Sequence, residues 1–536
     1  MPVWTSRLDI GEFGVTHTES GLPVKEVYTA ADAPDPASAP GVFPFTRGVR
    51  HDGYRTRPWT IRQYAGFGGG SDTNERLRFL VENGLSGLSI ALDLPTQMGL
   101  DSDDERANYE VGRLGVAVDC LADMEAIYDG IPIERISSSF TINGTAPVIL
   151  AYYVAMADRR GVPRSSLSGT VQNDLLKEFV ARGAYLYPPE PSVRLSTDVI
   201  EFCIQELPRW NPISIAAAHM RSAGATPVMS DGFMFANAIA YCESVLARGI
   251  PFDQFGPQLS FLTSAYEDVF ETIARFRACR TVWATIAEQR FGATSERAKM
   301  FRVHSGGDID AMTSAEPINN IARMTLNAFG AAAGGVQSLQ VPCYDEAFEI
   351  PSEAAVLNAL RVQHIVAFES GVRYTPDPFA GSYFIESLTQ AVVQQITDIV
   401  ENVTGSGGAI AWITDGRMQT AIAEEARVWE ERLADGREVR VGSDGAQPGV
   451  DGGAEVKFHQ FSPDAAIAQI TRLQKFRLER DASSVNDALS KVVDAARDAT
   501  NVMGPLIAAA KAGATTGEMC SALGEVFGDF DAPVGI

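Results

Sequence analysis

The feature that most constrains this chain is a regular alternation of short apolar or β-branched runs with longer segments of helical period, which begins near residue 85. Such an alternation is typical of βα units around a parallel sheet. Strand candidates separated by helices, eight in all, fit within about 260 residues, as a (β/α)8 barrel requires. A doubly wound open sheet is the weaker alternative, because no glycine fingerprint follows the first candidate. We predict an α/β fold: a (β/α)8 TIM barrel with an N-terminal arm and a C-terminal helical extension.

The predicted strands are 85–94, 115–119, 136–143, 167–172, 213–219, 258–262, 300–304 and 336–341. Helical periodicity covers, for example, 146–157, 173–182, 196–207, 232–247 and 318–332.

The chain divides into four predicted parts. Residues 1–70 form an arm that is rich in Pro, Gly and Arg over 25–70, and residues 71–400 form the barrel. Residues 401–460 are a helical segment followed by a linker rich in Gly and Asp, because 436–460 includes Gly442, Gly445, Gly449, Gly452 and Gly453 with Asp444 and Asp451. Residues 461–536 form a helical tail.

Charge and cysteine content exclude several classes of function. The chain has 44 Lys+Arg against 68 Asp+Glu, a formal charge of −24, which repels polyanions and argues against nucleic acid or an anionic membrane as a partner. Its six cysteines are scattered without a CxxC pair, so we predict reduced thiols and no metal site. No export signal or membrane span is visible. We expect a soluble cytoplasmic protein.

Reactive groups of such a barrel lie at the carboxyl ends of its strands. His219 and His304 end the fifth and seventh predicted strands, and Gln172 and Gln340 lie at or next to the ends of the fourth and eighth. One histidine at a barrel end is often only structural. Two histidines and two glutamines around one rim indicate an active site.

A second cluster lies before the barrel. Five arginines fall within sixteen residues of a very acidic chain, and aromatic residues lie among and directly after them: Arg47, Arg50, Arg55, Arg57 and Arg62, with Tyr54, Trp59 and Tyr64. Stacking and guanidinium groups suit a nucleotide-like ligand with phosphates. The alternative is a solvated basic stretch, and we favour the anion site.

Several ordered motifs carry a family resemblance. They are YRTRPWTIRQYAGF (54–67), 87–95, GTVQNDLLKE (169–178), YPPEPSVR (187–194), HMRSAGAT (219–226), 334–339, DEAFEIP (345–351) and 377–386. Together they closely resemble the coenzyme B12-dependent acyl-CoA mutases, the methylmalonyl-CoA mutase family. The resemblance implies an isomerase whose barrel takes up the CoA chain, with the acyl group beneath adenosylcobalamin.

The resemblance also implies site residues. Those for the acyl-CoA chain are Arg57, Thr60, Arg62, Ser89 and Ser260, with His304 added for the substrate; those for the cofactor are Glu346 and Leu92. In the acyl pocket, His219 and Gln172 would hold the thioester oxygen, and Tyr64 would wall in the radicals. Arg182 would pair with a substrate carboxylate, as in methylmalonyl-CoA or ethylmalonyl-CoA, where isobutyryl-type mutases have glutamine. The alternative for Arg182 is a surface ion pair.

The sequence also departs from the family. The motif Asp-x-His-x-x-Gly, whose histidine coordinates cobalt, does not occur, so we expect a separate small cobalamin-binding subunit and a dimer of large subunits in a heterotetramer. Rim residues differ as well: Ala218, Ser222, Gly306 and Pro342 replace larger or hydrogen-bonding residues, and Gln258 replaces an arginine. These changes leave two hypotheses open, a mutase retuned for an unusual acyl group and a noncatalytic acyl-CoA-binding subunit.

Overall fold

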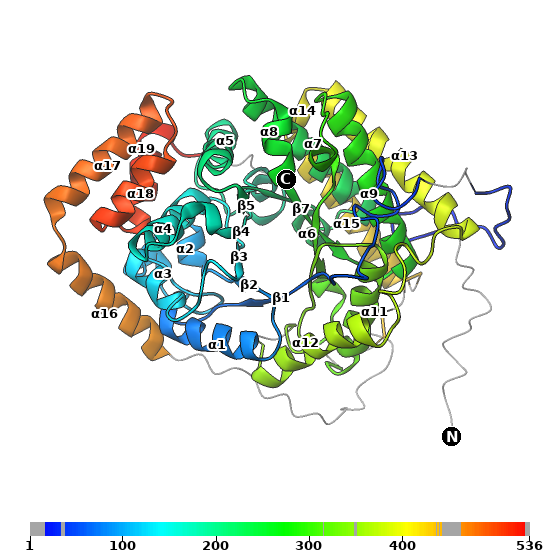
Figure 1. The fold of residues 1–536 in the computed structure, drawn as a ribbon, viewed down its shortest axis with the longest axis horizontal. Coiled ribbons are helices and arrows are strands. Elements are labelled where there is room, and N and C mark those ends of the chain that lie inside the picture. Colours follow the sequence, from blue (N-terminus) through cyan, green and yellow to red (C-terminus); the bar gives the residue numbers. More distant parts are fainter. Residues whose placement is uncertain are drawn as a thin grey trace.

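The computed structural model describes residues 17–33, 38–314, 316–347, 351–435, 437–438, 440–441 and 463–530. Its centre is one parallel sheet with the strand order β5-β4-β3-β2-β1-β9-β8-β7-β6 (Figure 1). Strand β5 (Arg209–Asn211) and strand β6 (Ser214–Ala216) are separated only by Pro212 and Ile213. Proline has no N–H for the ladder, so we read β5 and β6 as one interrupted strand. It pairs with β4 on one side and β7 on the other, which closes an eight-position barrel.

The other strands are β1 Thr60–Ala65, β2 Gly87–Ile90, β3 Ser137–Phe140, β4 Ser168–Val171, β7 Ser260–Ala265, β8 Val303–Gly307 and β9 Ser338–Gln340. The predicted (β/α)8 barrel is therefore confirmed, with one strand placed wrongly. Residues 115–119 are not a strand, since Val116 makes only an isolated bridge to Leu92. The missing strand is β1, which pairs with β2 and β9 and lies within the range predicted as an arm.

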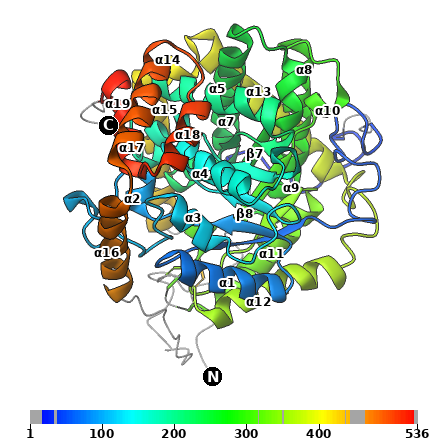
Figure 2. The same cartoon turned by 60° about the vertical axis from the view of Figure 1, so that its left-hand side comes forward.

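Helices surround the barrel (Figures 1 and 2). They are α1 Gly70–Glu82, α3 Leu121–Ile127, α4 Ala146–Arg159, α5 Pro189–Glu206, α7 Pro227–Ala247, α9 Val269–Gln289, α11 Asn319–Ala333 and α12 Glu353–Phe368. Shorter helices lie in the loops after strands, namely α2 Leu94–Gln97, the π-helix η3 Glu178–Arg182 and α6 Ala218–Ser222. Two more, α8 Phe252–Phe255 and α10 Glu296–Lys299, lie in the loops that lead into β7 and β8. Helix α4 is buried almost all round because it packs mainly against α18 and α3.

The chain beyond the barrel is helical: α13 Tyr383–Gly405, α14 Gly408–Thr414, α15 Arg417–Ala434, α16 Pro463–Glu479, α17 Ala482–Arg497, α18 Met503–Ala512 and α19 Thr516–Phe527. Helices α17–α19 lie together beside α4 (Figure 1), where Tyr152 donates to the carbonyl of Ala514 at 3.0 Å. Most of the predicted Gly/Asp linker lies outside the described residues. None of the helices in the described ranges is long and apolar enough to cross a bilayer. The division into four parts stays a prediction.

Candidate active site

A cavity of about 480 Å³ runs through the barrel. TIM barrels normally fill this space with bulky branched side chains. Here the inward positions alternate along each strand and carry mostly small hydroxyl residues, so the interior stays open. The lining residues from the strands include Thr60, Arg62, Tyr64, Ser89, Ser139, Thr170, Ser214, Ser260, Ser264, His304, Gly306, Ser338 and Gln340.

At the carboxyl end of the channel, Gln172 directly follows β4, as predicted, and is 2% exposed. Its Oε1 accepts hydrogen bonds from Asn143 Nδ2 at 3.0 Å and from Lys177 Nζ at 2.8 Å. Lys177 is fully buried and pairs with Glu178 at 3.0 Å. Both contacts are made to the amide oxygen of Gln172. They hold the side chain in place and leave its amide nitrogen as a hydrogen-bond donor.

Arg182 and His219 complete this end of the channel, and both line the cavity. Arg182 pairs with Glu178 at 3.5 Å and donates to Gln97 Oε1 at 2.7 Å. His219 lies on helix α6, three residues beyond the last residue of β6 and not at a strand end. Lys177 Nζ lies 3.4 Å from His219 Nδ1 and 3.5 Å from Nε2. The structure therefore brings Gln172, Arg182 and His219 together.

The charge state of this group follows from its burial. Burial and the charges of Lys177 and Arg182 hold the pKa of His219 well below its usual 6.5. Burial also lowers the pKa of Lys177. His219 is therefore a neutral imidazole at pH 7, a polarising hydrogen-bonding group and not a cation.

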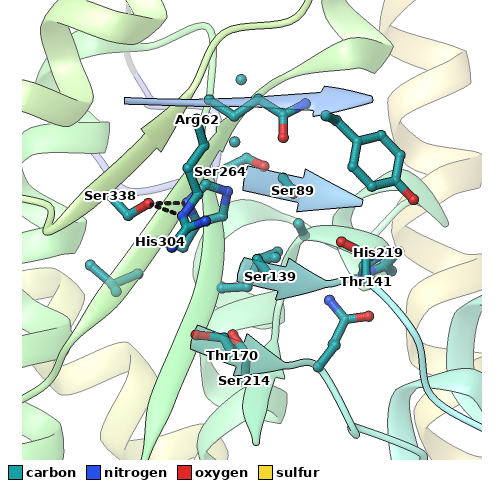
Figure 3. Close-up of a pocket in the computed structure, with 18 of the residues that line it drawn as sticks. Arg62, Ser89, Ser139, Thr141, Thr170, Ser214, His219, Ser264, His304 and Ser338 are labelled. Atoms are coloured by element: carbon teal, nitrogen blue, oxygen red, sulfur yellow. Dashed lines mark hydrogen bonds between the residues drawn. The ribbon is translucent and has the colours of Figure 1, made fainter. Parts of the chain in front are cut away.

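His304 lies at the opposite end of the channel, and its predicted place at the end of a strand is wrong. It is the second residue of β8, which continues to Gly307. His304 Nδ1 lies 2.9 Å from Ser338 Oγ, and the same hydroxyl accepts from Arg62 Nε at 3.2 Å. Figure 3 shows Arg62, His304 and Ser338 together at one end of the strands and His219 with Thr141 at the other.

Arg62 is 8% exposed and makes its hydrogen bonds to neutral groups, donating also to Ser137 Oγ at 2.8 Å and to the carbonyl of Leu88. No carboxylate within the described ranges lies within 4 Å of it. Burial lowers the pKa of Arg62 to about 10. Burial and the Arg62 charge lower the pKa of His304 to about 3, so this histidine is also neutral.

The remaining predicted ligand residues fall in different places. Thr60, Ser89 and Ser260 line the cavity, whereas Arg57 is exposed outside it. Leu92 is fully buried and does not line the cavity. The five-arginine cluster is split, because Arg47 pairs with Asp377 at 3.3 Å, Arg50 pairs with Asp52 at 3.1 Å, and Arg62 lies inside the barrel.

Tyr64 and Glu346 line the cavity near its carboxyl-end mouth. Burial raises the pKa of the Tyr64 hydroxyl, so it remains protonated at pH 7. Glu346 accepts the backbone N–H of Cys343 at 2.8 Å, and burial raises its pKa to about 7. The replaced rim residues Ala218, Ser222, Gly306 and Pro342 line the same mouth.

Sequence reasoning missed Lys177, Glu178 and Asn143. Lysine and glutamate are rarely buried, so nothing in their residue type points inward. Asn143 is the last residue of the third predicted strand. It could have been selected by the same rule that selected His219, namely that residues at strand ends are site candidates. Its Nδ2 also contacts Glu178 Oε1 at 2.5 Å.

Comparisons with known proteins fit this geometry. The methylmalonyl-CoA mutase family profile matches residues 17–529. The 2-hydroxyisobutanoyl-CoA mutase large subunit of Aquincola tertiaricarbonis is 41% identical over 97% of this chain and 93% of its own length. Methylmalonyl-CoA mutases of Rhizobium meliloti and Homo sapiens are 38% and 35% identical, over 97% of this chain and 73% and 69% of their own lengths.

The fold and site thus define an acyl-CoA isomerase of the B12-dependent class. The chain belongs to the methylmalonyl-CoA mutase family.

Proposed function

We propose that this chain is the acyl-CoA-binding large subunit of an adenosylcobalamin-dependent mutase that moves a thioester carbonyl group between adjacent carbons. The proposed substrate is a branched, carboxylated acyl-CoA such as methylmalonyl-CoA or ethylmalonyl-CoA. The observation that carries this choice is Arg182, which lines the cavity beside His219. Within the described part of the chain, the one carboxylate that pairs with Arg182 is Glu178, which is shared with buried Lys177. One carboxylate thus faces two cations, and a substrate carboxylate would supply the second negative charge.

The protein's part in the reaction is positioning and polarisation. His219, held neutral, donates a hydrogen bond to the thioester oxygen, and Gln172, fixed by Asn143 and Lys177, holds the same polar end. The Tyr64 ring walls the pocket and excludes other partners for a radical. When bound, adenosylcobalamin supplies the radical that removes hydrogen from an unactivated carbon.

The mouth of the cavity fits the adenosyl group of that cofactor. Glu346 offers a carboxyl group that accepts only one backbone hydrogen bond among the described contacts, so it retains capacity for a ribose hydroxyl. A Cβ at Gly306 would meet only Ser264 Oγ, at 3.3 Å, so space is open there. Glu346 and the backbone around Gly306 are the residues we assign to the cofactor, and Leu92 would contribute only packing.

Two observations support the proposal of a second subunit. The sequence has no Asp-x-His-x-x-Gly motif, and a relative covered over 93% of its length is named a large subunit. We propose that a small cobalamin-binding subunit supplies the cobalt ligand. The dimer of large subunits in a heterotetramer stays a prediction.

Arg182→Gln tests the substrate class. We expect the variant to bind methylmalonyl-CoA about 100-fold more weakly and isobutyryl-CoA almost unchanged, because only the carboxylate loses its ionic partner. Isothermal calorimetry measures both, with Arg159→Gln as the control since Arg159 pairs with Glu125 on the surface. Equal effects on both thioesters would reject the carboxylated class.

The noncatalytic alternative is favoured by one observation: Ser222, Gly306 and Pro342 all line the mouth of the cavity, where the family has larger or hydrogen-bonding residues. Mixing the chain with a cobalamin-binding subunit, adenosylcobalamin and a panel of acyl-CoAs decides between the two. Isomerised product by mass spectrometry supports the mutase, and acyl-CoA binding without product supports the alternative.

A further inference from the structure

The ends of β7 and β8 place two polar residues side by side at the carboxyl mouth of the channel. The register pairs Ser264 with Gly306 and Ala265 with Gly307. Tyr266 and Asp308 are therefore the residues that directly follow these two strands. Asn327 joins them: its Oδ1 accepts the N–H of Asp308 at 3.0 Å, and its Nδ2 donates to the carbonyl of Tyr266 at 3.1 Å.

Both residues line the cavity, and each has a buried oxygen without a partner among the described residues. Asp308 is 2% exposed; its Oδ1 accepts the N–H of Asp310 at 3.2 Å, whereas its Oδ2 has no partner. The Tyr266 hydroxyl has none either. Buried polar atoms are normally satisfied, so these two are available to a ligand.

The surroundings leave room beside this pair. Small residues are among those that line the cavity: Ser264 and Gly306, which precede the pair on β7 and β8, and Ala218 and Ser222 of α6. The Tyr266 ring is held from outside by Arg275 at 4.6 Å and by Arg221 at 5.5 Å from its centroid. Arg221 pairs with Glu19, and no described cation forms an ion pair with Asp308.

We propose that Tyr266 and Asp308 form a subsite for a ligand hydroxyl. A hydroxyl accepts one hydrogen bond from the Tyr266 O–H and donates one to Asp308 Oδ2, which neither a methyl group nor a carboxylate does. The hydroxyl belongs to the acyl group or to the ribose of the adenosyl group. This inference rests on the proposed function, because it assumes that the cavity receives those ligands.

Binding to the chain without cofactor tests the subsite. The probes are isobutyryl-CoA, its 2-hydroxy and 3-hydroxy derivatives, and 5′-deoxyadenosine, measured by calorimetry. If the acyl group supplies the hydroxyl, we expect one hydroxylated thioester to bind about tenfold more tightly than isobutyryl-CoA. Tyr266→Phe and Asp308→Asn would each remove that preference. If the ribose supplies it, both variants would instead weaken 5′-deoxyadenosine by about tenfold.

Two control variants make the result specific. The Tyr128 hydroxyl is also buried without a partner among described residues, but Tyr128 does not line the cavity, so Tyr128→Phe should change neither affinity. Asp310 also lines the cavity, two residues away, but it is exposed, so Asp310→Asn should have a smaller effect than Asp308→Asn.

The proposal is overturned if neither hydroxyl-dependent affinity changes in Tyr266→Phe, or if Asp310→Asn matches Asp308→Asn, since that would indicate only long-range charge. If Asp308→Asn fails to fold, the affinities of Tyr266→Phe alone test the proposal. None of these probes carries a free acyl carboxylate, so the outcome is independent of Arg182→Gln, which tests the substrate class.

Discussion

The two ends of the channel each place a neutral histidine beside cationic side chains, but they balance charge differently. At the carboxyl end, His219 lies beside Lys177 and Arg182, and Glu178 pairs with both cations. At the amino end, His304 shares the Ser338 hydroxyl with Arg62, whose described partners are all neutral.

This difference separates two tasks. The carboxyl end is a connected network in which one carboxylate, two cations, Gln172 and His219 depend on one another, so it holds reacting groups in place. The amino end has a buried guanidinium without an anion, which attracts a negatively charged or strongly accepting part of a ligand. We therefore propose that the first end serves the chemistry and that the second holds the CoA chain.

The largest expected effect concerns the connected network. Lys177→Met leaves Glu178 with Arg182, at 3.5 Å, as its one cationic partner among the described residues, beside the neutral amide of Asn143. The change also removes a donor from Gln172. Removing one partner of a buried pair costs about 3 to 5 kcal/mol, and we expect a loss of unfolding free energy of that size. Urea denaturation measures it, with Lys475→Met as the control at an exposed pair with Glu479. A loss below about 1 kcal/mol, the value of a surface pair, would show that the network is not connected.

The next effect is on turnover. His219→Ala should fold and bind acyl-CoA but lose about 10² to 10³ in rate in the assembled complex, because one polarising hydrogen bond in a dry site is lost. Steady-state kinetics and calorimetry on the same protein separate rate from binding. His51→Ala, at an exposed histidine, is the control. Wild-type turnover in His219→Ala would make His219 a structural residue.

The barrel could be predicted because the outward faces of most strands are apolar and alternate with helices. Seven of its eight positions overlap predicted strands. The eighth, β1, was missed because Thr60, Arg62 and Tyr64 face the channel and hide the apolar pattern of a strand. Residues 115–119 were mistaken for it because Val116, Ala117 and Val118 are apolar and buried without being paired in the sheet.

The candidate site was predictable only in part. Family motifs located His219, Gln172 and Arg182 in one cavity, but not the contacts between them. The strand-end rule misplaced His304 because β8 ends in two glycines, which are depleted in strands, so the predicted strand stops three residues early. Lys177 could not be predicted as buried, since only the fold supplies its partners Gln172 and Glu178.

A smaller effect concerns the amino end. Arg62→Ala removes the buried guanidinium, and we expect CoA thioesters to bind about 1.5 to 3 kcal/mol more weakly, the value of a charge-assisted hydrogen bond. Calorimetry with CoA thioesters measures this. Arg57→Ala is the matched comparison, because Arg57 is exposed and outside the cavity. If Arg57 also binds CoA, as predicted, Arg57→Ala should lower the affinity for CoA thioesters too. Unchanged affinity in both variants would show that the amino end of the channel does not bind CoA.

The smallest effect is the pH dependence that His304 contributes. Its pKa is about 3 in the folded protein, against 6.5 for an ordinary histidine. Between these values the unfolded chain binds a proton that the folded chain does not, so acid lowers the unfolding free energy, by about 1.4 kcal/mol per pH unit at full effect. His304→Gln cannot titrate, so its unfolding free energy should fall less steeply from pH 5.5 to 4.5, by about that amount per unit. Urea titrations of wild type, His304→Gln and the exposed control His51→Gln measure the slopes. A slope in His304→Gln equal to that of wild type would mean that His304 is hydrated and charged in the folded protein, and the two ends of the channel would then differ in the charge of their histidines as well as in their ion pairs.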